Sequence, residues 1–289
     1  MREARARGGP EATVVGVIGS PIAHSLSPLL HNAAFAALDL AGWRSFAFEI
    51  PAGEAGRALE DARRYDVRGL SVTMPHKADV ASLMDATSDV ASRLGAVNCV
   101  VNRDGALTGT NTDGQGFVDS LARGVGFDPA ARRCLVVGAG GAARAVILAL
   151  ADAGAAEVAV LNRTAVRGSE AAALAGAAGT VVGGDVAAAV GRADLVVNAT
   201  PLGMTGGHDA HTWPVAPGLL RAGQVAVDLV YAPRPTSWLE RAAAQGATPL
   251  DGLGMLVHQA AAQLVLWTGL EAPVEQMWQA AETAFPDEG

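Results

Sequence analysis

The fold is decided by the stretch RRCLVVGAGGAARAVILALADAG, which occupies residues 132–154. Its apolar run CLVV is typical of a buried strand, its glycines predict a tight turn, and the alanine-rich segment after them predicts a helix that ends at Gly154. A strand, a glycine-rich turn and a helix in this order form the first βα unit of a dinucleotide-binding fold. We therefore expect a parallel sheet with helices on both faces around this stretch.

Strand-like and helix-like segments alternate on both sides of it. Before it, strands are predicted at 13–19, 45–50 and 69–73 with helices from 28, over 54–64 and over 85–95, and the turn Asp104-Gly105 is expected to join two antiparallel strands. After it, strands are predicted in AEVAVLNR, DLVVNAT, QVAVDLV and ATPL, with alanine-rich helices between them and two helices after Gly254. The alternation predicts an α/β protein whose second sheet is doubly wound and Rossmann-type.

Composition and charge exclude several classes of protein. Half of the 289 residues are apolar, so the chain folds, and at about 150 residues per domain it has room for two domains. The net charge of -8 argues against a nucleic acid partner, and no apolar run approaches the roughly 20 residues that a membrane span needs. Cys99 and Cys134 have neither disulfide-framework nor metal-ligand spacing. We expect a cytoplasmic protein without a metal site.

The glycine-rich turn fits the pattern GxGxxG/A as Gly138-Ala139-Gly140-Gly141-Ala142-Ala143. Gly138 permits the tight turn, Gly140 lets a pyrophosphate approach the backbone, and the amides at the start of the helix favour phosphate. A plain tight turn between a strand and a helix is the simpler alternative. The position after a strand and before a helix favours dinucleotide binding.

The end of the next strand indicates which dinucleotide is bound. An NAD site usually has a carboxylate there, but this chain has Asn162, Arg163 and Thr164, with Arg167 beyond. An arginine can pair with a 2′-phosphate, and the alternative is a solvated arginine at the end of a strand. The pattern favours NADP over NAD.

Three further residues have both structural and functional interpretations. Lys77 is the single lysine of the chain, and a lysine, unlike an arginine, can give up its proton when its surroundings shift its pKa. Asp113 precedes an expected helix and is first of all a candidate N-cap. Ser27 is likewise a candidate N-cap, with Pro28 as the first residue of the following helix. Residue type alone leaves both possibilities open at each position.

The order of the motifs resembles the shikimate dehydrogenase family over about residues 13–275. The resemblance is carried by Gly19-Ser-Pro21, His24-Ser25-Leu-Ser27-Pro28, Ser71-Val-Thr73-Met-Pro75-His-Lys77, Gly95-Ala-Val-Asn98, Asn111-Thr-Asp113, the glycine-rich turn, Asn162-Arg-Thr164, Asn198-Ala-Thr-Pro-Leu-Gly-Met204, Asp228-Leu-Val-Tyr231-Ala-Pro233 and Gly254-Met-Leu-Val-His-Gln259. It implies a substrate-binding domain over 13–112 plus 253–289, an NADP-binding domain over 113–252, and an active site in the cleft between the two domains. The arginine-rich segment 1–12, which precedes the first strand, is expected to be a flexible extension.

The resemblance also implies an activity and roles for individual residues. Members reduce 3-dehydroshikimate with NADPH to shikimate, on the route to aromatic amino acids. Lys77 and Asp113 would form the catalytic pair, and the substrate would be held by Ser25, Ser27, Thr73, Asn98, Tyr231 and Gln259. The cofactor would be held by Gly138, Ala139, Gly140, Gly141, Ala142, Asn162, Arg163, Thr164, Arg167, Thr200, Met204 and Gly252. The partners expected are small molecules, and the protein would be a monomer or a homodimer.

Two departures from the family pattern bear on the substrate. Most members have Asn where this chain has Ser71, and commonly Thr where it has Cys99. Ser71 is shorter and lacks an amide, so a quinate/shikimate or aminoshikimate dehydrogenase stays open as an alternative. Cys99 is interpreted as strand packing. A non-catalytic nucleotide or metabolite sensor is the alternative from another class, and the intact pair of Lys77 and Asp113 argues against it.

Overall fold

The computed structural model describes residues 1, 3, 12–204 and 212–285. The extension expected at 1–12 lies for the most part outside the described residues. The chain divides into two compact units: unit 1 is Met1–Thr112 with Val257–Gly289, and unit 2 is Asp113–Leu256. The first turn of the long helix that starts at Leu253 belongs to unit 2, because Met255 packs into the core of that unit.

Unit 1 is built on a mixed sheet with strand order β2-β1-β3-β5-β6-β4. β1, β2 and β3 are parallel, β5 runs antiparallel to β3 and to β6, and β4 pairs parallel with β6 at the edge. Its strands are β1 Thr13–Gly19, β2 Trp43–Glu49, β3 Val67–Val72, β4 Ala86–Thr87, β5 Cys99–Arg103 and β6 Ala106–Thr110. Its helices are α2 Ser27–Ala37, α3 Ala55–Arg64, α4 Lys77–Ala81, α5 Asp89–Leu94, α11 Leu253–Thr268 and α12 Val274–Glu282.

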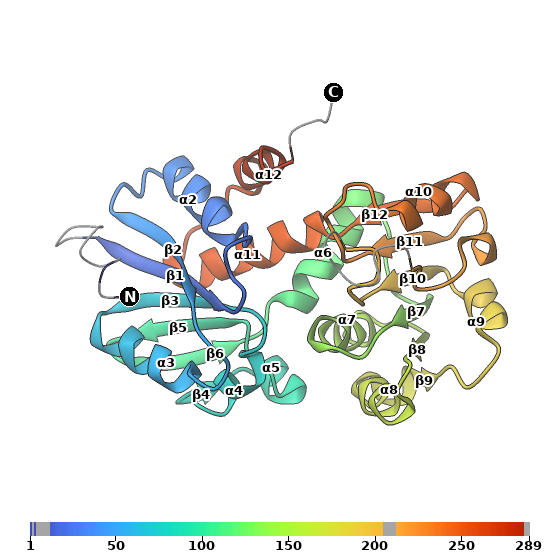
Figure 1. Ribbon diagram of the computed structural model, residues 1–289, viewed down its shortest axis with the longest axis horizontal. Coiled ribbons are helices and arrows are strands. Elements are labelled where there is room, and N and C mark those ends of the chain that lie inside the picture. The colour runs from blue at the N-terminus through green and yellow to red at the C-terminus, as the bar shows by residue number, and fades with distance from the viewer. Residues whose placement is uncertain (2, 4–11, 205–211, 286–289) are drawn as a thin grey trace. The chain divides into compact units, whose positions relative to one another are not determined.

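Helices cover both faces of this sheet (Figure 1). On one face, Ile18 and Leu70 pack against Leu59 of α3. On the other face lie α2, α12 and the part of α11 that belongs to unit 1, and the indole of Trp267 donates to the carbonyl of Val100 at 3.0 Å. Burial on both faces explains why the strands read as nearly continuous apolar runs.

Unit 2 contains a parallel sheet with strand order β12-β11-β10-β7-β8-β9, the doubly wound arrangement that the glycine-rich stretch predicts. Its strands are β7 Arg133–Val137, β8 Glu157–Leu161, β9 Gly179–Val181, β10 Leu195–Asn198, β11 Val225–Asp228 and β12 Thr248–Asp251. The helices are α6 Asp113–Val125, α7 Gly141–Asp152, α8 Ala165–Ala172, α9 Val186–Arg192 and α10 Ser237–Ala244, with 3-10 turns η1 Ala173–Ala178 and η2 Pro217–Leu219. The α/β fold class is confirmed.

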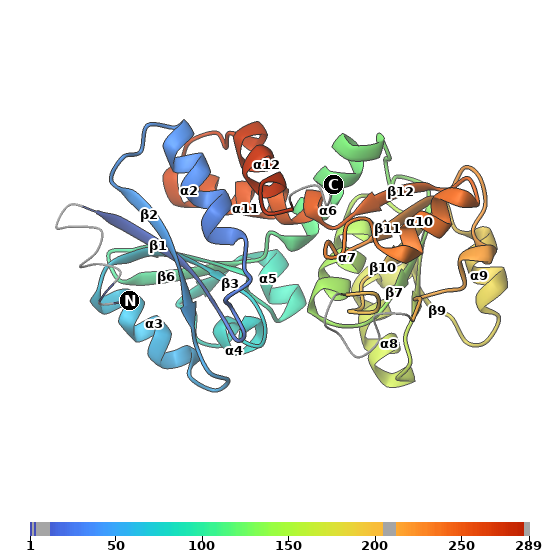
Figure 2. The ribbon, with the colours of Figure 1, turned by 45° about the horizontal axis from the view of Figure 1, so that its top comes forward.

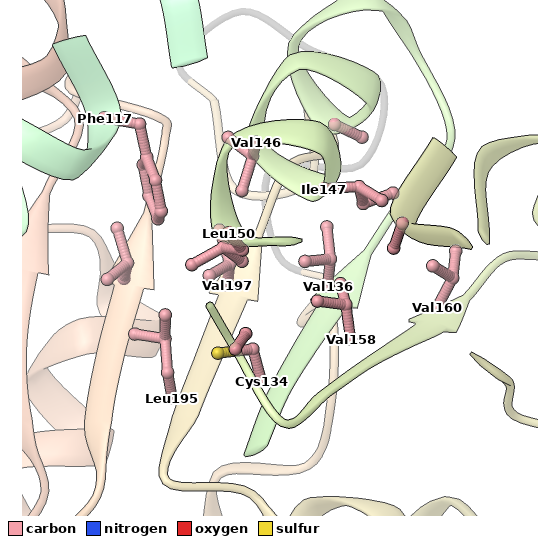
Figure 3. Close-up of a cluster of buried hydrophobic side chains, with 14 of the residues drawn as sticks. Phe117, Cys134, Val136, Val146, Ile147, Leu150, Val158, Val160, Leu195 and Val197 are labelled. Atoms are coloured by element: carbon pink, nitrogen blue, oxygen red, sulfur yellow. The ribbon is translucent and has the colours of Figure 1, made fainter. Parts of the chain in front are cut away.

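The core of unit 2 lies between the sheet and the helices α6 and α7 (Figure 3). Phe117 of α6 and Leu150 of α7 face valines of β7, β8 and β10, and these side chains are almost wholly buried. A second cluster covers the other face of the sheet with side chains of α9 and α10, including the fully buried Trp238. Figure 2 shows α9 and α10 on the side of this sheet away from α7 and α8.

One local prediction is corrected, one strand was missed, and one turn is confirmed. The helix expected over 85–95 begins only at Asp89, because Ala86 and Thr87 pair with β6 and the hydroxyl of Ser88 caps the helix by accepting from Ala91 N at 3.2 Å. Strand β9 was not predicted from the sequence. The turn at Asp104-Gly105 is confirmed, since both residues have positive φ and join β5 to β6.

Among the described residues, none of the helices combines the length and the apolar character that crossing a bilayer would require.

The core of unit 2 yields a prediction about stability. Leu150→Ala should lower the free energy of unfolding by about 2–5 kcal/mol, because it removes buried methyl groups and leaves a cavity. Leu270→Ala is the control: this leucine is 43% exposed, and its loss should change stability by less than about 0.5 kcal/mol. Urea unfolding followed by circular dichroism measures both, and equal effects of the two changes would contradict the packing described here.

Candidate active site

One edge of the unit 1 sheet gathers the ends of three strands. β1 ends at Gly19, β3 ends at Val72, and the antiparallel β5 begins at Cys99, opposite Ser71. In open α/β sheets, ligands bind beyond the carboxyl ends of the parallel strands. The segments that leave this edge carry unit 1 residues singled out in the sequence, namely Ser25, Ser27, Thr73, Lys77 and Asn98.

Ser25 and Ser27 lie at the start of α2. Ser27 is buried and Ser25 half-buried, and the amide of Ser27 donates to the hydroxyl of Ser25 at 3.4 Å. The interpretation of Ser27 as an N-cap is wrong, because the helix begins at Ser27 and its N-cap is Leu26, whose side chain makes no capping hydrogen bond. Two hydroxyl groups therefore lie next to the first amides of a helix, a combination that suits an anion.

Thr73 and Lys77 lie on the segment that follows β3. The amide of Thr73 donates to the carbonyl of Ile18 on β1 at 2.9 Å, and the carbonyl of Lys77 accepts from Val97 N at 2.8 Å. Between them, the buried ring of His76 donates from Nε2 to the carbonyl of Ile50 at 2.7 Å. The backbone that carries Thr73 and Lys77 is thus held at three points, and His76 has a structural role.

Asn98 joins this edge to two distant segments of unit 1. Its Oδ1 accepts from the amide of Thr112 at 2.7 Å, and its Nδ2 donates to the hydroxyl of Thr112 at 3.1 Å. That hydroxyl donates to the carbonyl of Gln259 on α11 at 3.1 Å. Asn98, Thr112 and Gln259 are all buried, so the network lies inside the unit and fixes the three segments together.

Asp113 follows Thr112 directly and is buried. The structural alternative for this residue is corrected: α6 begins at Asp113 itself, so Asp113 lies in the first turn of the helix and not at its N-cap. A carboxylate in the first turn is still favoured by the helix dipole.

In unit 2, the glycine-rich turn connects β7 to α7. Gly138 has φ of 120°, and a Cβ atom there would approach the carbonyl oxygen of Ala199 to 2.8 Å, so only glycine fits. Gly140 is the N-cap of α7 and Gly141 its first residue, and a Cβ atom on either would meet no described atom within 4 Å. Among the described residues, no atom therefore fills the space that the two missing side chains leave at the start of α7.

Arg163 and Arg167 are both exposed near the start of α8. Thr164 is the N-cap of this helix, and its carbonyl accepts from Nδ2 of Asn162 at 2.8 Å. The side chain of Asn162 thereby fixes the turn that presents Arg163. Two cations and a helix N-terminus are available at the end of β8.

A buried carboxylate organises the ends of β10 and β11. Asp228 Oδ1 accepts from Asn198 Nδ2 at 2.8 Å and from Val230 N at 3.1 Å, and Oδ2 accepts from the hydroxyl of Thr236 at 2.7 Å. The amide oxygen of Asn198 in turn accepts from the hydroxyl of Thr200 at 2.6 Å. Burial raises the pKa of Asp228 in spite of these hydrogen bonds.

The other unit 2 residues singled out in the sequence lie on the segments that follow β10, β11 and β12. Met204 is 43% exposed and follows Thr200 in the segment after β10. Tyr231 follows β11 and is half-buried, and burial raises the pKa of its hydroxyl. Gly252 is buried after β12, where a side chain would collide with the carbonyl of Leu229.

Both thiols are structural. Cys99 and Cys134 are buried free cysteines in β5 and β7, and burial raises the pKa of both thiols. A buried thiol with a raised pKa is a poor nucleophile. Within the described ranges, no three His, Cys, Asp or Glu side chains are placed to hold a metal ion together.

Two residues of these networks were missed by sequence reasoning. Thr112 was named only as the middle residue of the motif Asn111-Thr-Asp113, and Asp228 only as the first residue of its motif. Neither was predicted to make buried hydrogen bonds. A signal was available for Asp228, because a carboxylate in the apolar run QVAVDLV needs buried partners. None was available for Thr112, whose partner on α11 is 147 residues away.

Three family models match the chain. They are the shikimate dehydrogenase substrate binding domain over residues 17–100, shikimate / quinate 5-dehydrogenase over 120–203, and the shikimate 5′-dehydrogenase C-terminal domain over 252–282. The shikimate dehydrogenase (NADP(+)) of Moorella thermoacetica is 46% identical over 91% of this chain and 90% of its own. That of Methanopyrus kandleri is 42% identical over 93% of this chain and 95% of its own. The crystal structure of shikimate 5-dehydrogenase from Thermus thermophilus, in complex with NADP(H) and shikimate, has a TM-score of 0.86 and 38% identity, and covers 94% of this chain and 99% of that chain.

The network around Asp228 yields a prediction. Asp228→Ala should lower the free energy of unfolding by about 3 kcal/mol, because donors from Asn198, Val230 and Thr236 lose a buried acceptor. Asp228→Asn keeps an acceptor oxygen and should cost less than about 1 kcal/mol at neutral pH.

The same carboxyl sets a pH dependence. The pKa of Asp228 in the folded protein is raised above its ordinary value of 3.8. Above this raised pKa, the buried carboxylate lowers the stability of the folded protein. The loss of stability disappears as the pH falls through the raised pKa, because the carboxyl then takes up a proton. The stability of Asp228→Asn relative to the natural protein should therefore improve as the pH rises through that pKa. Urea unfolding at a series of pH values measures the difference, and a decline with rising pH would contradict the raised pKa.

Proposed function

The chain belongs to the shikimate dehydrogenase family, and on this premise we propose which of its residues carry the reaction. It is an NADP-dependent oxidoreductase that interconverts shikimate and 3-dehydroshikimate in the shikimate pathway. The observation that supports the site most is the convergence of Thr73, Lys77 and Asn98 at one edge of the unit 1 sheet, with Gln259 joined to Asn98 through Thr112.

NADP fits the glycine-rich turn of unit 2. The diphosphate would lie against Ala139, Gly140, Gly141 and Ala142, where the missing side chains of the two glycines leave the amides of α7 accessible. Ala143 is fully buried and serves the packing of α7 on the sheet. Thr200 and Met204, on the segment that Asn198 fixes, and Gly252 complete the proposed cofactor residues.

The preference for NADP is assigned to the end of β8. Arg163 and Arg167 would pair with the 2′-phosphate, with Asn162 and Thr164 hydrogen-bonding beside them. The exposure of both guanidinium groups and the position of Thr164 at the N-cap of α8 support this assignment.

The substrate is assigned to unit 1, and Tyr231 is proposed as a further substrate residue. The hydroxyls of Ser25 and Ser27, next to the first amides of α2, suit the substrate carboxylate. Thr73, Asn98, Asp113 and Gln259 would hold the ring hydroxyls. The raised pKa of Tyr231 keeps its phenol neutral, so it can donate a hydrogen bond.

The reaction requires a proton to be delivered to a ketone oxygen. When bound, the reduced nicotinamide supplies the hydride that reduces the ketone carbon. Negative charge then grows on the ketone oxygen, so a cation that can donate a proton stabilises the transition state. We assign this role to Lys77 and Asp113 as a pair, in which Asp113 orients the ammonium group and the reacting hydroxyl.

We further propose that unit 1 is the substrate-binding domain, expected from the sequence over 13–112 plus 253–289, and that unit 2 is the NADP-binding domain, expected over 113–252, with residues 253–256 now placed in unit 2. The cytoplasmic location, and a monomeric or homodimeric state, stay predictions from the sequence. Sedimentation velocity distinguishes the two oligomeric states.

The activity itself is tested by following the absorbance of the reduced nicotinamide while the protein oxidises shikimate. Parallel reactions contain NADP or NAD, and each is repeated with quinate. Rapid reduction of NADP with shikimate, and much slower reduction in the other three reactions, is the expected result. Preferred turnover of NAD with quinate would instead favour a quinate/shikimate dehydrogenase and would overturn the role given to Arg163.

Lys77 provides a prediction about catalysis. Lys77→Ala should lower kcat by about a thousandfold and change KM for shikimate by only a fewfold, because the lost interaction belongs to the transition state. Lys77→Arg should fail similarly, since a guanidinium group does not exchange its proton near neutral pH. Steady-state kinetics measure both, with thermal unfolding as the check on folding. An unchanged kcat in Lys77→Ala would remove Lys77 from the mechanism.

Arg163 provides a prediction about cofactor choice. Arg163→Ala should raise KM for NADP by about tenfold to a hundredfold, the loss expected for a charge-assisted hydrogen bond, and leave KM for NAD nearly unchanged. Arg192→Ala is the matched control, because Arg192 is also an exposed arginine of unit 2 but lies in the last turn of α9. Equal losses with NADP and NAD would contradict recognition of the 2′-phosphate.

A further inference from the structure

Gln263 is a buried glutamine one turn after Gln259 on α11. Its side chain is fully buried, and its Nε2 donates to the carbonyl oxygen of Asn98 at 3.2 Å and to Oε1 of Gln259 at 2.9 Å. The same carbonyl of Asn98 accepts from Val72 N at 2.7 Å. Gln263 therefore ties the side chain of Gln259 to the backbone of the sheet edge that carries the proposed substrate residues.

These contacts determine the polarity of both side chains. A backbone carbonyl can only accept, so the atom of Gln263 that faces Asn98 O must be the donor Nε2. Because the same Nε2 also faces Gln259, the atom of Gln259 on that side must be the acceptor Oε1. The opposite end of the Gln259 amide is its Nε2, so Gln259 is oriented as a donor toward groups on its other side.

The described part of the fold provides partners only for the nitrogen of the amide at position 263. Among the described residues, Oε1 of Gln263 is buried and has no hydrogen-bond partner. A buried acceptor without a partner carries a desolvation penalty that an apolar side chain of the same size would avoid. Gln224 of unit 2 shows the contrast: it is equally buried, but its Nε2 donates to the carbonyls of Val190 and Ala193 and its Oε1 accepts from Arg221 N.

We propose that Gln263 is a positioning residue for the substrate: it holds Gln259 with its Nε2 as the end that donates to a ring hydroxyl oxygen of shikimate. This inference rests on the proposed function, in which Gln259 binds a ring hydroxyl. Without Gln263, the Gln259 amide can rotate and present its oxygen or its nitrogen, and the ordering of the side chain must then come from substrate binding.

The test is Gln263→Met, which keeps the length of the side chain and removes its donors. KM for shikimate should rise about tenfold, the effect of one hydrogen bond, while kcat and KM for NADP stay within about twofold. Thermal unfolding should show a Tm close to the natural value, because the loss of the two hydrogen bonds from Nε2 and the removal of the unpartnered acceptor oppose each other. In a Gln259→Leu background, Gln263→Met should have no further effect on KM for shikimate, since it acts through Gln259.

Gln224→Met is the matched control, a change of the same kind at a fully bonded buried glutamine. It should lower Tm and leave KM for shikimate unchanged. Gln263→Glu is the second variant and decides the question if Gln263→Met does not fold. A carboxylate there has no donor, and a protonated carboxyl has one donor for two acceptors, so KM for shikimate should rise again.

Two results would overturn the positioning role. One is an unchanged KM for shikimate in a folded Gln263 variant. The other is a full tenfold rise in this KM when Gln263→Met is added to Gln259→Leu. The proposed function fails differently. If Gln259→Leu itself leaves KM for shikimate unchanged, the role of Gln259 is wrong. If Gln259→Leu raises this KM and Gln263→Met does not, only the positioning role is wrong.

Discussion

Unit 1 depends on the buried side-chain amide of Asn98. Its oxygen accepts from the backbone of Thr112, its nitrogen donates to the hydroxyl of Thr112, and its own carbonyl accepts from Val72 and from Gln263. An amide offers a donor and an acceptor side by side, and no other neutral side chain of this size does. Replacing Asn98 with leucine or aspartate would leave at least one buried group of this network, on Thr112 or on its partner Gln259, without a hydrogen bond. The free-energy cost of an unsatisfied polar group is highest in the interior. The edge of the sheet, the end of the unit 1 segment at Thr112 and the helix α11 are therefore fixed by one residue.

Unit 2 uses a charged group for the same purpose. Asp228 joins the segments after β10 and β11 by accepting three hydrogen bonds, and its raised pKa records the cost of burying the carboxyl. Asn98 needs both donors and acceptors because its partners are of both kinds, whereas every partner of Asp228 is a donor. An acceptor-only side chain suits that set of partners. The chemistry of the neighbouring loops thus selects amide in one unit and carboxyl in the other.

The sequence predicted those parts of the structure that local pattern controls. The strand, turn and helix over 132–154 follow from apolar runs and glycine, and the turn at Asp104-Gly105 follows from residues that adopt positive φ easily. β4 and β9 were missed because they have only 2 and 3 residues, too few for a periodic pattern, and they exist through pairing with β6 and β8. Thr112 and Gln263 were missed as members of the network because their partners lie 147 and 165 residues away in the chain. Such contacts depend on the tertiary fold, which no local window contains.

The glycines of the nucleotide turn separate what the fold requires from what a ligand requires. Gly138 is explained entirely by the protein, because its φ and the nearby carbonyl of Ala199 exclude every other residue. Gly141 has no such explanation: it is the first residue of α7, and a Cβ atom there would meet no described atom within 4 Å. The described part of the protein therefore gives no steric reason for glycine at this position, and the diphosphate site proposed at this turn supplies one. The diphosphate of NADP is the group whose charge suits the amides exposed at that point.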